Sequence, residues 1–279
     1  MKSTILVSIV IATKNEEKNI ENCLKSIKKQ TYPQNKIEII VVDNNSQDKT
    51  VQIAKKFTKN VYMFGPERSS QRNFGMFKKS KGKYVMFLDA DMSLDVKTIA
   101  KAVQKMNSDK LVALYIPEVI IGDSFWSRVK NFERSFYDQT VIDGLRFFKK
   151  NAFKKVGGFD EKLIACEDWD LDKRIIKLGK IGILKREGNE VIFHHDNDFN
   201  VKRYLLKKNY YSKSFQKYIN KWGKNDKDIK LQFGFWYRYF RVFLENGKWK
   251  RFLSKPLYVL GFYLLKFWVG IFYLFSKLK

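Results

Sequence analysis

Phe87-Leu88-Asp89-Ala90-Asp91-Met92 joins an apolar run to two closely spaced carboxylates. The run extends back to Tyr84, and its length and composition predict a buried strand. Successive side chains of an extended backbone alternate, so Asp89 and Asp91 lie on one side and Ala90 points away. Two carboxylates at the C-terminal end of a strand could hold a divalent cation, although a solvated Asp-x-Asp loop would have the same pattern.

Two further predicted strands also lead into polar residues. The strand at Ile5–Ile11 leads into Thr13-Lys14-Asn15-Glu16, and the strand at Lys36–Val42 leads into the run from Asp43 to Thr50. The carboxyl ends of strands in open α/β sheets are where ligands bind. Helical spacing alternates with these strands, which is typical of βαβ units. The predicted helices are Glu17–Gln30, Asp48–Lys56 with Asp48 as N-cap, Val96–Met106 and Asp168–Leu178.

The order of four segments resembles that of the family 2 inverting glycosyltransferases. The segments are Thr13-Lys14-Asn15-Glu16, Val41–Thr50, Arg72-Asn73-Phe74-Gly75 and Asp89-Ala90-Asp91. The resemblance covers about residues 5–200, and the motifs are specific together although each is weak alone. It implies the glycosyltransferase-A fold, an α/β fold with a Rossmann-like mixed sheet and helices on both faces. Ala12 departs from the proline that the family often has there.

The resemblance also implies a nucleoside-diphosphate-sugar donor and a divalent cation, Mn²⁺ or Mg²⁺. The residues that it places around the donor are Thr13, Asn15, Glu16, Asp43, Arg68, Arg72 and Asp89. Asp91, together with Asp89, is the expected metal ligand. A surface role for Arg72 and a simple turn at Asp43 remain alternatives from the residues themselves.

A second acidic cluster is Cys166-Glu167-Asp168-Trp169-Asp170. Acids favour the first turn of a helix, which is the structural alternative. In the family a Glu-Asp pair stands here, so the resemblance makes Asp168 the general base that deprotonates an acceptor hydroxyl, with Glu167 as its partner. Asp170 and Asp172 are expected to face solvent or to orient neighbours. The residues expected near the acceptor are Arg146, Gly158, Trp169 and His195.

His194 and His195 are the two histidines of the chain, and both follow a short predicted strand at Val191–Phe193. A lone histidine is usually structural, but this pair accompanies an acidic site. Many relatives in the family have a metal-binding histidine at this place, and we favour His194 over His195. An imidazole ligand would favour Mn²⁺ over Mg²⁺.

The formal charge of +26 requires an acidic partner or an anionic surface. Residues 200–279 hold about 19 Lys and Arg against about 3 acids, together with over half of the aromatic residues. Nucleic acid would explain the charge alone, but basic residues among long apolar runs favour an anionic membrane surface. We therefore predict two domains, a catalytic domain at 1–200 and membrane-associated helices at 201–279.

The run Leu257–Phe275 is about 19 residues, close to the length that crosses a bilayer. Lys266 at its centre is costly in a single spanning helix. The run could span with Lys266 facing protein, lie in the interface with Lys266 snorkelling, or form a soluble helical cap. We favour the interfacial alternative.

The resemblance, together with the basic and aromatic C-terminal segment, implies a hexosyltransferase at the cytoplasmic face of the cell membrane, with a polyprenyl-linked glycan as acceptor and no nucleic acid partner. A polyprenyl-phosphate glycosyl synthase is the close alternative, since an acceptor that is already an anion needs no base. A basic nucleic-acid-binding protein and a non-catalytic membrane adaptor are the others. We expect no cleaved leader before Ile5–Ile11. Cys23 and Cys166 are too few for a disulfide framework and fit a reduced, cytosolic setting.

Overall fold

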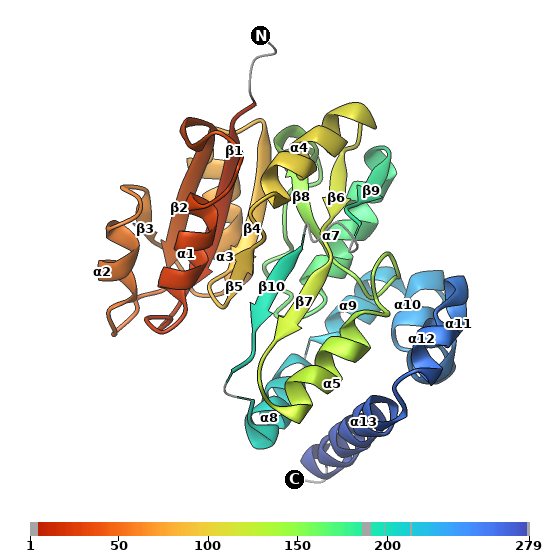
Figure 1. Ribbon diagram of the computed structural model, residues 1–279. Helices are drawn as coiled ribbons and strands as arrows, with labels where there is room; N and C mark the ends of the chain where they lie inside the picture. The colour runs from red at the N-terminus through yellow and green to blue at the C-terminus, as the bar shows by residue number, and fades with distance from the viewer. Residues whose placement is uncertain (1–4, 186–190, 198, 213, 278–279) are drawn as a thin grey trace. The chain divides into compact units, whose positions relative to one another are not determined.

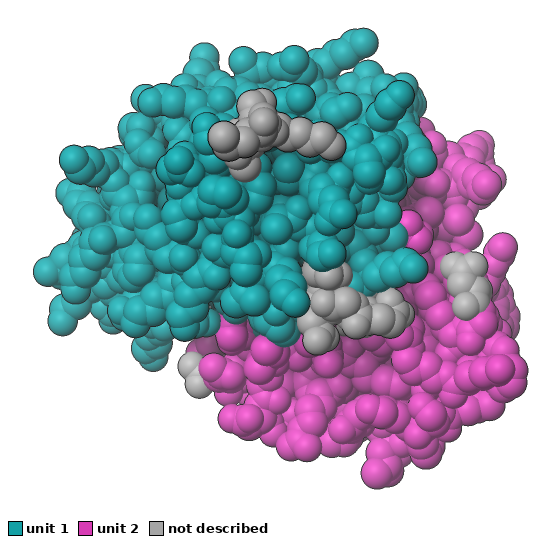
Figure 2. Space-filling view, turned by 45° about the horizontal axis from the view of Figure 1, so that its top comes forward, with its two compact units in different colours: residues 1–118, 144–194 teal, residues 119–143, 195–279 magenta. Residues whose placement is uncertain are grey.

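The structure is a computed structural model, which describes residues 5–185, 191–197, 199–212 and 214–277 (Figure 1). The chain divides into two compact units, shown in different colours in Figure 2. The first unit comprises residues 1–118 and 144–194, and the second comprises residues 119–143 and 195–279. This division differs from the predicted ranges 1–200 and 201–279, because residues 119–143 belong to the same unit as the C-terminal segment.

A seven-stranded mixed sheet forms the first unit, in the order β3-β2-β1-β4-β8-β6-β9. Strands β1 to β4 are parallel, whereas β8 runs antiparallel to both of its neighbours. The register sets Thr13 opposite Asp43 and Ala12 opposite Asp89, so three strand ends meet at one edge. The strands are β1 (Val7–Thr13), β2 (Ile37–Asp43), β3 (Val61–Met63), β4 (Tyr84–Asp89), β6 (Ala113–Tyr115), β8 (Leu145–Lys149) and β9 (Ile181–Ile183).

Helices cover both faces of this sheet, which confirms the predicted mixed α/β architecture. Alternate residues of one strand enter different cores: Ile9 belongs to the core that includes helix α1, and Val10 to the core that includes α7. The strands are apolar on both sides because both sides are covered. The helices are α1 (Ile20–Lys28), α2 (Thr50–Lys55), α3 (Arg68–Asn73), α4 (Thr98–Ser108), α6 (Lys150–Lys155) and α7 (Glu167–Ile175).

A small second sheet has the order β5-β10-β7, with β5 at Met92–Leu94, β7 at Glu118–Ile121 and β10 at Ile192–His195. In the first unit β10 pairs antiparallel with β5, and this register sets His194 opposite Met92. The pairing therefore brings His194 next to Asp91, although 103 positions separate the two residues.

The predicted helices and strands of the first unit are confirmed, with ends displaced by at most three residues. Asp48 is not the N-cap: helix α2 begins at Thr50 with Lys49 as N-cap, and the Asp48 side chain accepts from the Thr50 amide instead. The region 125–153 is aromatic and less periodic in sequence, and it contains α5 (Phe125–Arg134), β8 and α6.

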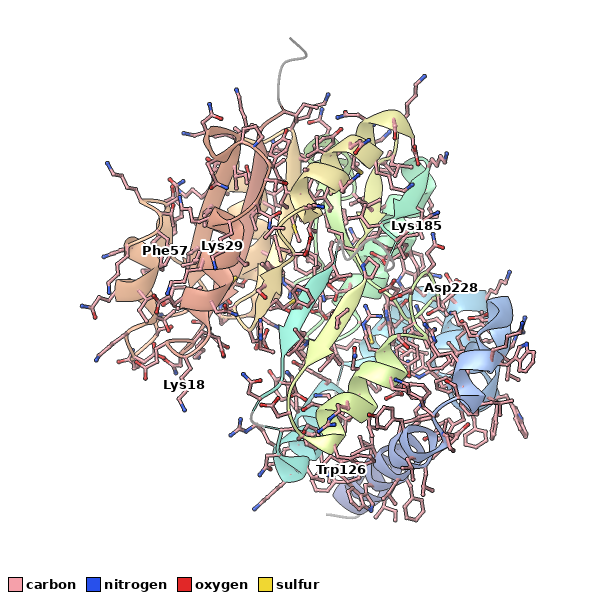
Figure 3. The ribbon with its side chains drawn as sticks, in the orientation of Figure 1. Lys18, Lys29, Phe57, Trp126, Lys185 and Asp228 are labelled. Carbon is pink, nitrogen blue, oxygen red and sulfur yellow. The ribbon has the colours of Figure 1, made fainter. Side chains whose placement is uncertain are left out.

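The second unit is mainly helical after β7 and has its own aromatic core. Figure 1 shows α13, in dark blue, beside α5. Trp126 of α5, labelled in Figure 3, contacts Trp268 of α13 with 5.6 Å between ring centroids. The helices besides α5 are α8 (Val201–Ser212), α9 (Phe215–Trp222), α10 (Lys227–Gln232), α11 (Val242–Leu244), α12 (Trp249–Leu253) and α13 (Pro256–Lys277).

Lys266 of α13 points into this aromatic core. Its ammonium group lies 3.1 Å from Glu133 of α5 and donates to the Arg238 carbonyl at 2.7 Å. Burial lowers the pKa of Lys266, and the Glu133 carboxylate opposes that shift. The predicted snorkelling of Lys266 is therefore wrong, because the side chain has a protein partner.

In the part of the chain that the structure describes, no helix combines the length and the apolar character needed to cross a bilayer. The described residues therefore give no support to the spanning alternative for Leu257–Phe275.

Candidate active site

The ends of β1 and β2 are tied together through Asp43. This carboxylate is fully buried and accepts three hydrogen bonds, from Thr13 Oγ1 at 2.8 Å, from the Ser46 amide at 2.8 Å and from Ser46 Oγ at 2.6 Å. Buried carboxylates need such partners, and these bonds fix the turn after β2 against the end of β1. Thr13 and Asp43, both predicted to line the donor pocket, are thus in direct contact.

The loops after β1 and β2 form a second set of bonds. Asn15 has a φ of 55°, and its amide donates to Ser46 Oγ while its side-chain oxygen accepts from the Gln47 amide, both at 2.8 Å. The Glu16 amide donates to Thr50 Oγ1 at 2.7 Å. The left-handed region is open to asparagine at modest cost. These bonds make one rigid edge from two loops.

Gln71 is a residue of this edge that the sequence did not indicate. Its amide nitrogen donates to the carbonyls of Thr13 at 3.0 Å and Val42 at 2.7 Å, and the side chain is buried. Helix α3 therefore holds the ends of β1 and β2 at a fixed distance. A glutamine in a helix resembles any surface residue in sequence, so only the contact reveals its role.

Arg72 lies at the centre of a cluster of carboxylates. It is 1% exposed, and its guanidinium lies 2.6 Å from Asp89, 3.4 Å from Glu167 and 3.6 Å from Asp168. The same group lies 4.2 Å from the centre of the Phe87 ring. A planar guanidinium suits such a buried site, because it offers several donors and also stacks on aromatic rings. The alternative of a surface arginine is excluded.

Asp89 is enclosed by positive charge. Burial opposes its ionisation, but the charges of Arg72, Arg146 and Arg68 outweigh burial and hold the pKa of Asp89 well below its usual range. Arg146 lies 3.9 Å from the second Asp89 oxygen. Asp89 is therefore an ionised carboxylate whose oxygens face arginines.

Glu167 and Asp168 begin helix α7, directly after Cys166 with its φ of 64°. Burial and the neighbouring Asp168 charge raise the pKa of Glu167 to about 7, against the opposing charges of Arg68 and Arg72. The side chain of Asp168 is 30% exposed, whereas that of Glu167 is 7% exposed. Oδ1 of Asp168 is itself buried, faces Arg72 and has no hydrogen-bond partner among the described residues, so the exposed surface of this side chain lies elsewhere on it. Of the two carboxylates, Asp168 is the one that an incoming hydroxyl could reach.

His194 lies between two carboxylates. Its Nδ1 is 2.9 Å from Glu118 Oε1, and its Nε2 is 3.2 Å from Asp91 Oδ2. Burial would lower the pKa of His194, but the bonds to Asp91 and Glu118 raise it to about 10. Glu118, which is 7% exposed, also lies 3.3 Å from Arg146. Sequence analysis missed Glu118, and an acid that directly follows an apolar run was the available signal.

The residues at Asp91 and His194 fit a divalent cation. If the protonated Nδ1 of His194 donates to Glu118, Nε2 has a lone pair and faces an oxygen of Asp91, which is also an acceptor. Two acceptors at this distance need a proton or a metal ion between them. Within the described ranges no group of three or more His, Cys, Asp or Glu side chains is arranged as a metal site. The imidazole separates Glu118 from Asp91, and Asp89 faces arginines. Asp91 and His194 could thus supply two ligands, with phosphate and water oxygens as the others.

The residues expected at the acceptor differ in their surroundings. Arg146 joins Asp89 and Glu118, as described above. Gly158 has a φ of 68°, and an added Cβ would lie 2.5 Å from Asn73 Oδ1. The peptide of Phe159 exchanges two hydrogen bonds of 2.9 Å with Asn73, so Gly158 has a structural reason to be glycine. Trp169 is partly exposed, and His195 belongs to the second unit.

Asp170 and Asp172 are buried, so the expectation that they face solvent is wrong. Asp170 accepts from Arg174 at 2.6 Å, and Asp172 accepts from the Leu145 amide at 3.1 Å. These contacts of Asp170 and Asp172 hold α7 in place, and with it Glu167 and Asp168 in its first turn. They therefore orient neighbours, which was the other predicted possibility.

Comparison with known proteins gives consistent matches. The model of the family described as "Glycosyl transferase family 2" matches residues 8–159. Glycosyltransferase AglE of Haloferax volcanii is 36% identical over 199 residues, which are 64% of this chain and 64% of AglE. A Methanococcus voltae protein is 25% identical over 62% of each chain. It is named dolichyl N-acetyl-alpha-D-glucosaminyl phosphate 3-beta-D-2,3-diacetamido-2,3-dideoxy-beta-D-glucuronosyltransferase.

Solved structures share the fold. Mannosyltransferase PcManGT of Pyrobaculum calidifontis, solved with GDP-Man and Mn²⁺, has a TM-score of 0.60 at 18% identity, over 95% of this chain and 74% of that chain. S. aureus TarS 1-349, solved with UDP-GlcNAc, has a TM-score of 0.55 at 19% identity, over 76% of this chain and 66% of that chain. Among curated relatives, the match covers 64% of AglE and 48% of YdaM of Bacillus subtilis.

Proposed function

The chain belongs to glycosyl transferase family 2 and has the glycosyltransferase-A fold, and we propose that it is an inverting glycosyltransferase acting at a membrane. It transfers a hexose from a nucleoside-diphosphate sugar to a hydroxyl group of a lipid-linked glycan. The observation that carries this proposal is the partly exposed carboxylate of Asp168 in the first turn of α7, set beside the Arg72–Asp89 pair. An accessible carboxylate is what proton abstraction from a hydroxyl requires.

In the proposed reaction Asp168 takes the proton of the acceptor hydroxyl. The hydroxyl oxygen attacks the anomeric carbon from the face opposite the diphosphate, and the bond from that carbon to the diphosphate oxygen breaks. Arg72, whose guanidinium lies 3.6 Å from Asp168, gives this carboxylate a fixed cationic neighbour during the step. Glu167 is more deeply buried and positions the same arginine.

Donor binding is proposed at the edge formed by the ends of β1, β2 and β4. Thr13, Asn15, Glu16 and Asp43 form that edge, and Arg68, which is partly exposed, stands near it on α3. Asp91 and His194 would hold a divalent cation, Mn²⁺ or Mg²⁺, which when bound would supply positive charge against the diphosphate. The presence of Mn²⁺ and GDP-Man with the PcManGT fold supports this assignment.

The lipid-linked acceptor is supported by two observations. A relative of this chain is named for a dolichyl-linked sugar phosphate. In addition, residues 200–279 are strongly basic and aromatic, which suits a protein that works at an anionic surface. We propose the cytoplasmic face of the cell membrane as the site of action.

A donor screen followed by one substitution tests the proposed function. UDP-, GDP- and dTDP-sugars are screened with Mn²⁺ by thermal shift, since a bound ligand raises apparent stability. Transfer to a lipid-linked glycan is then measured for Asp168→Asn, which is expected to lose about 10²–10⁴ in rate while keeping donor affinity. Asp109→Asn, at a partly exposed carboxylate paired with Lys105, is the matched control. Near-full turnover by Asp168→Asn would refute the base and favour a synthase acting on a polyprenyl phosphate.

A further inference from the structure

Helix α13 presents an apolar stripe to solvent. Leu257 is 71% exposed, and the exposed side chains recur at alternating intervals of three and four residues. This spacing places them on one face of the helix. We call this set the outer stripe, and it consists of Leu257, Leu260, Leu264, Phe267 and Ile271.

The opposite face of α13 is already packed. Phe262 and Leu265 are buried in the aromatic core of the second unit, and Lys266 is paired with Glu133. An ordinary surface helix of a soluble protein has a polar outer face. Because α13 is apolar on both faces, its outer face requires a second apolar environment.

Exposed aromatic side chains lie next to the outer stripe. Phe235, Trp236 and Phe240 are exposed and in mutual ring contact, and we call them the aromatic cluster. The Phe240 ring lies 6.3 Å from Tyr263 of α13, which joins the cluster to the helix. Aromatic rings of this kind favour the boundary between water and lipid.

The charge around this surface is predominantly positive. Arg241, Lys250, Arg251 and Lys255 are exposed, and Glu245 is the only acid in the sequence from residue 241 to 279. Two copies of the chain facing each other across the outer stripe would bring these cations together. An anionic lipid surface instead offers both an apolar layer for the stripe and negative charge for the cations.

We propose that the outer stripe and the aromatic cluster dock on the interfacial region of an anionic lipid bilayer. The helix lies with its inner face on the protein and its outer face at the boundary between the headgroups and the acyl chains. The inference rests on the proposed function in one respect, since a lipid-linked acceptor requires the enzyme to be at a bilayer.

Vesicle flotation with the full chain tests this docking surface. Wild-type protein is expected to float with vesicles of phosphatidylcholine containing phosphatidylglycerol, and to bind pure phosphatidylcholine at least about tenfold more weakly. Leu260→Glu/Phe267→Glu is expected to weaken binding to the anionic vesicles by at least about tenfold. The matched control is Val96→Glu/Ile176→Glu, which adds the same charge at exposed apolar positions of the first unit and should bind like wild type.

A charge variant provides an independent check. Lys250→Gln/Lys255→Gln leaves the stripe intact and is expected to weaken anionic binding by about tenfold, with little change toward neutral vesicles. Circular dichroism verifies that each variant is folded.

Three results would overturn the docking surface. They are wild-type protein that does not float, a stripe variant that binds as tightly as its control, and a wild-type dimer in light scattering that the stripe variant dissociates without vesicles. Donor binding by thermal shift separates this proposal from the proposed function. The stripe variant should keep donor binding, and a wild-type chain that floats but binds no sugar nucleotide would refute only the proposed function.

Discussion

Glu118 Oε1 lies 2.9 Å from His194 Nδ1, while Nε2 of the same ring lies 3.2 Å from Asp91. By binding Nδ1, the glutamate fixes the orientation of the imidazole and turns Nε2 toward Asp91. Partners of this kind are known to raise the metal affinity of histidine ligands.

Replacing Glu118 by Gln is expected to weaken Mn²⁺ binding by about 10- to 100-fold, because the imidazole loses its fixed orientation and part of its basicity. Electron paramagnetic resonance of free Mn²⁺ measures the affinity directly, without any substrate. Glu21→Gln, at an exposed glutamate of α1, should leave the affinity unchanged. Equal affinities for the two variants would exclude Glu118 from metal binding.

Replacing Arg72 by Gln is expected to destabilise the protein by about 3–5 kcal/mol, because the buried part of Asp89 loses its closest cation. Arg68→Gln on the same helix should cost less than about 1 kcal/mol, since its side chain is 40% exposed. Urea denaturation of both variants at pH 7 gives the comparison. Similar costs would mean that the Arg72–Asp89 pair is not a stabilising contact.

The raised pKa of Glu167 predicts a pH dependence of stability. The shift from 4.5 to about 7 means that the folded state holds this proton more tightly than the unfolded state. The contribution of Glu167 is fully present below pH 4.5 and is lost as pH rises through about 7. Glu167→Gln removes this term, so its stability relative to wild type should increase between pH 5 and pH 8. A relative stability that stays flat over this range would argue against the buried, protonated glutamate.

Alanine substitutions at two neighbouring glycines distinguish the cost of backbone strain from the cost of a packing clash. Gly157 and Gly158 both have positive φ, but an alanine Cβ at Gly157 would meet nothing within 4 Å. Gly157→Ala should cost about 1–2 kcal/mol from the backbone alone. Gly158→Ala should cost about 1–3 kcal/mol more, because its Cβ would clash with Asn73 and Phe77. Chemical denaturation compares them, and equal costs would contradict the packing role of Gly158.

Much of the first unit could be predicted because its strands are continuous apolar runs with polar ends. Val10 and Val41 are buried on opposite faces of the sheet. Strands covered on both faces are apolar at every position, so they can be recognised as continuous apolar runs even though polar and apolar residues do not alternate. The carboxylates that end these strands, Asp43 and Asp89, were identified for the same reason. Helix α5 was missed because it contributes to an aromatic core that is completed by residues far along the chain, from Tyr237 to Leu265.

The contacts within the site were harder to predict than its members. Asp89 was expected to contact the metal and the donor, but nothing in its local sequence reveals two arginines, from α3 and β8, at its oxygens. Glu118 lies 76 positions from His194, and only the pairing of β5 with β10 brings that histidine to Asp91. The preference for His194 as a metal ligand stays a prediction. It is supported by the position of Nε2, which lies 3.2 Å from Asp91.

Lys266 has a consequence for any attempt to shorten this protein. Its pairing with Glu133, together with the burial of Phe262 and Leu265, makes α13 a structural part of the second unit. A chain that stops at residue 255 would expose the aromatic core and leave Glu133 without its ammonium partner. Removal of the helix to gain solubility should therefore produce aggregation, and polar replacement of the outer stripe is the better route to a detergent-free enzyme.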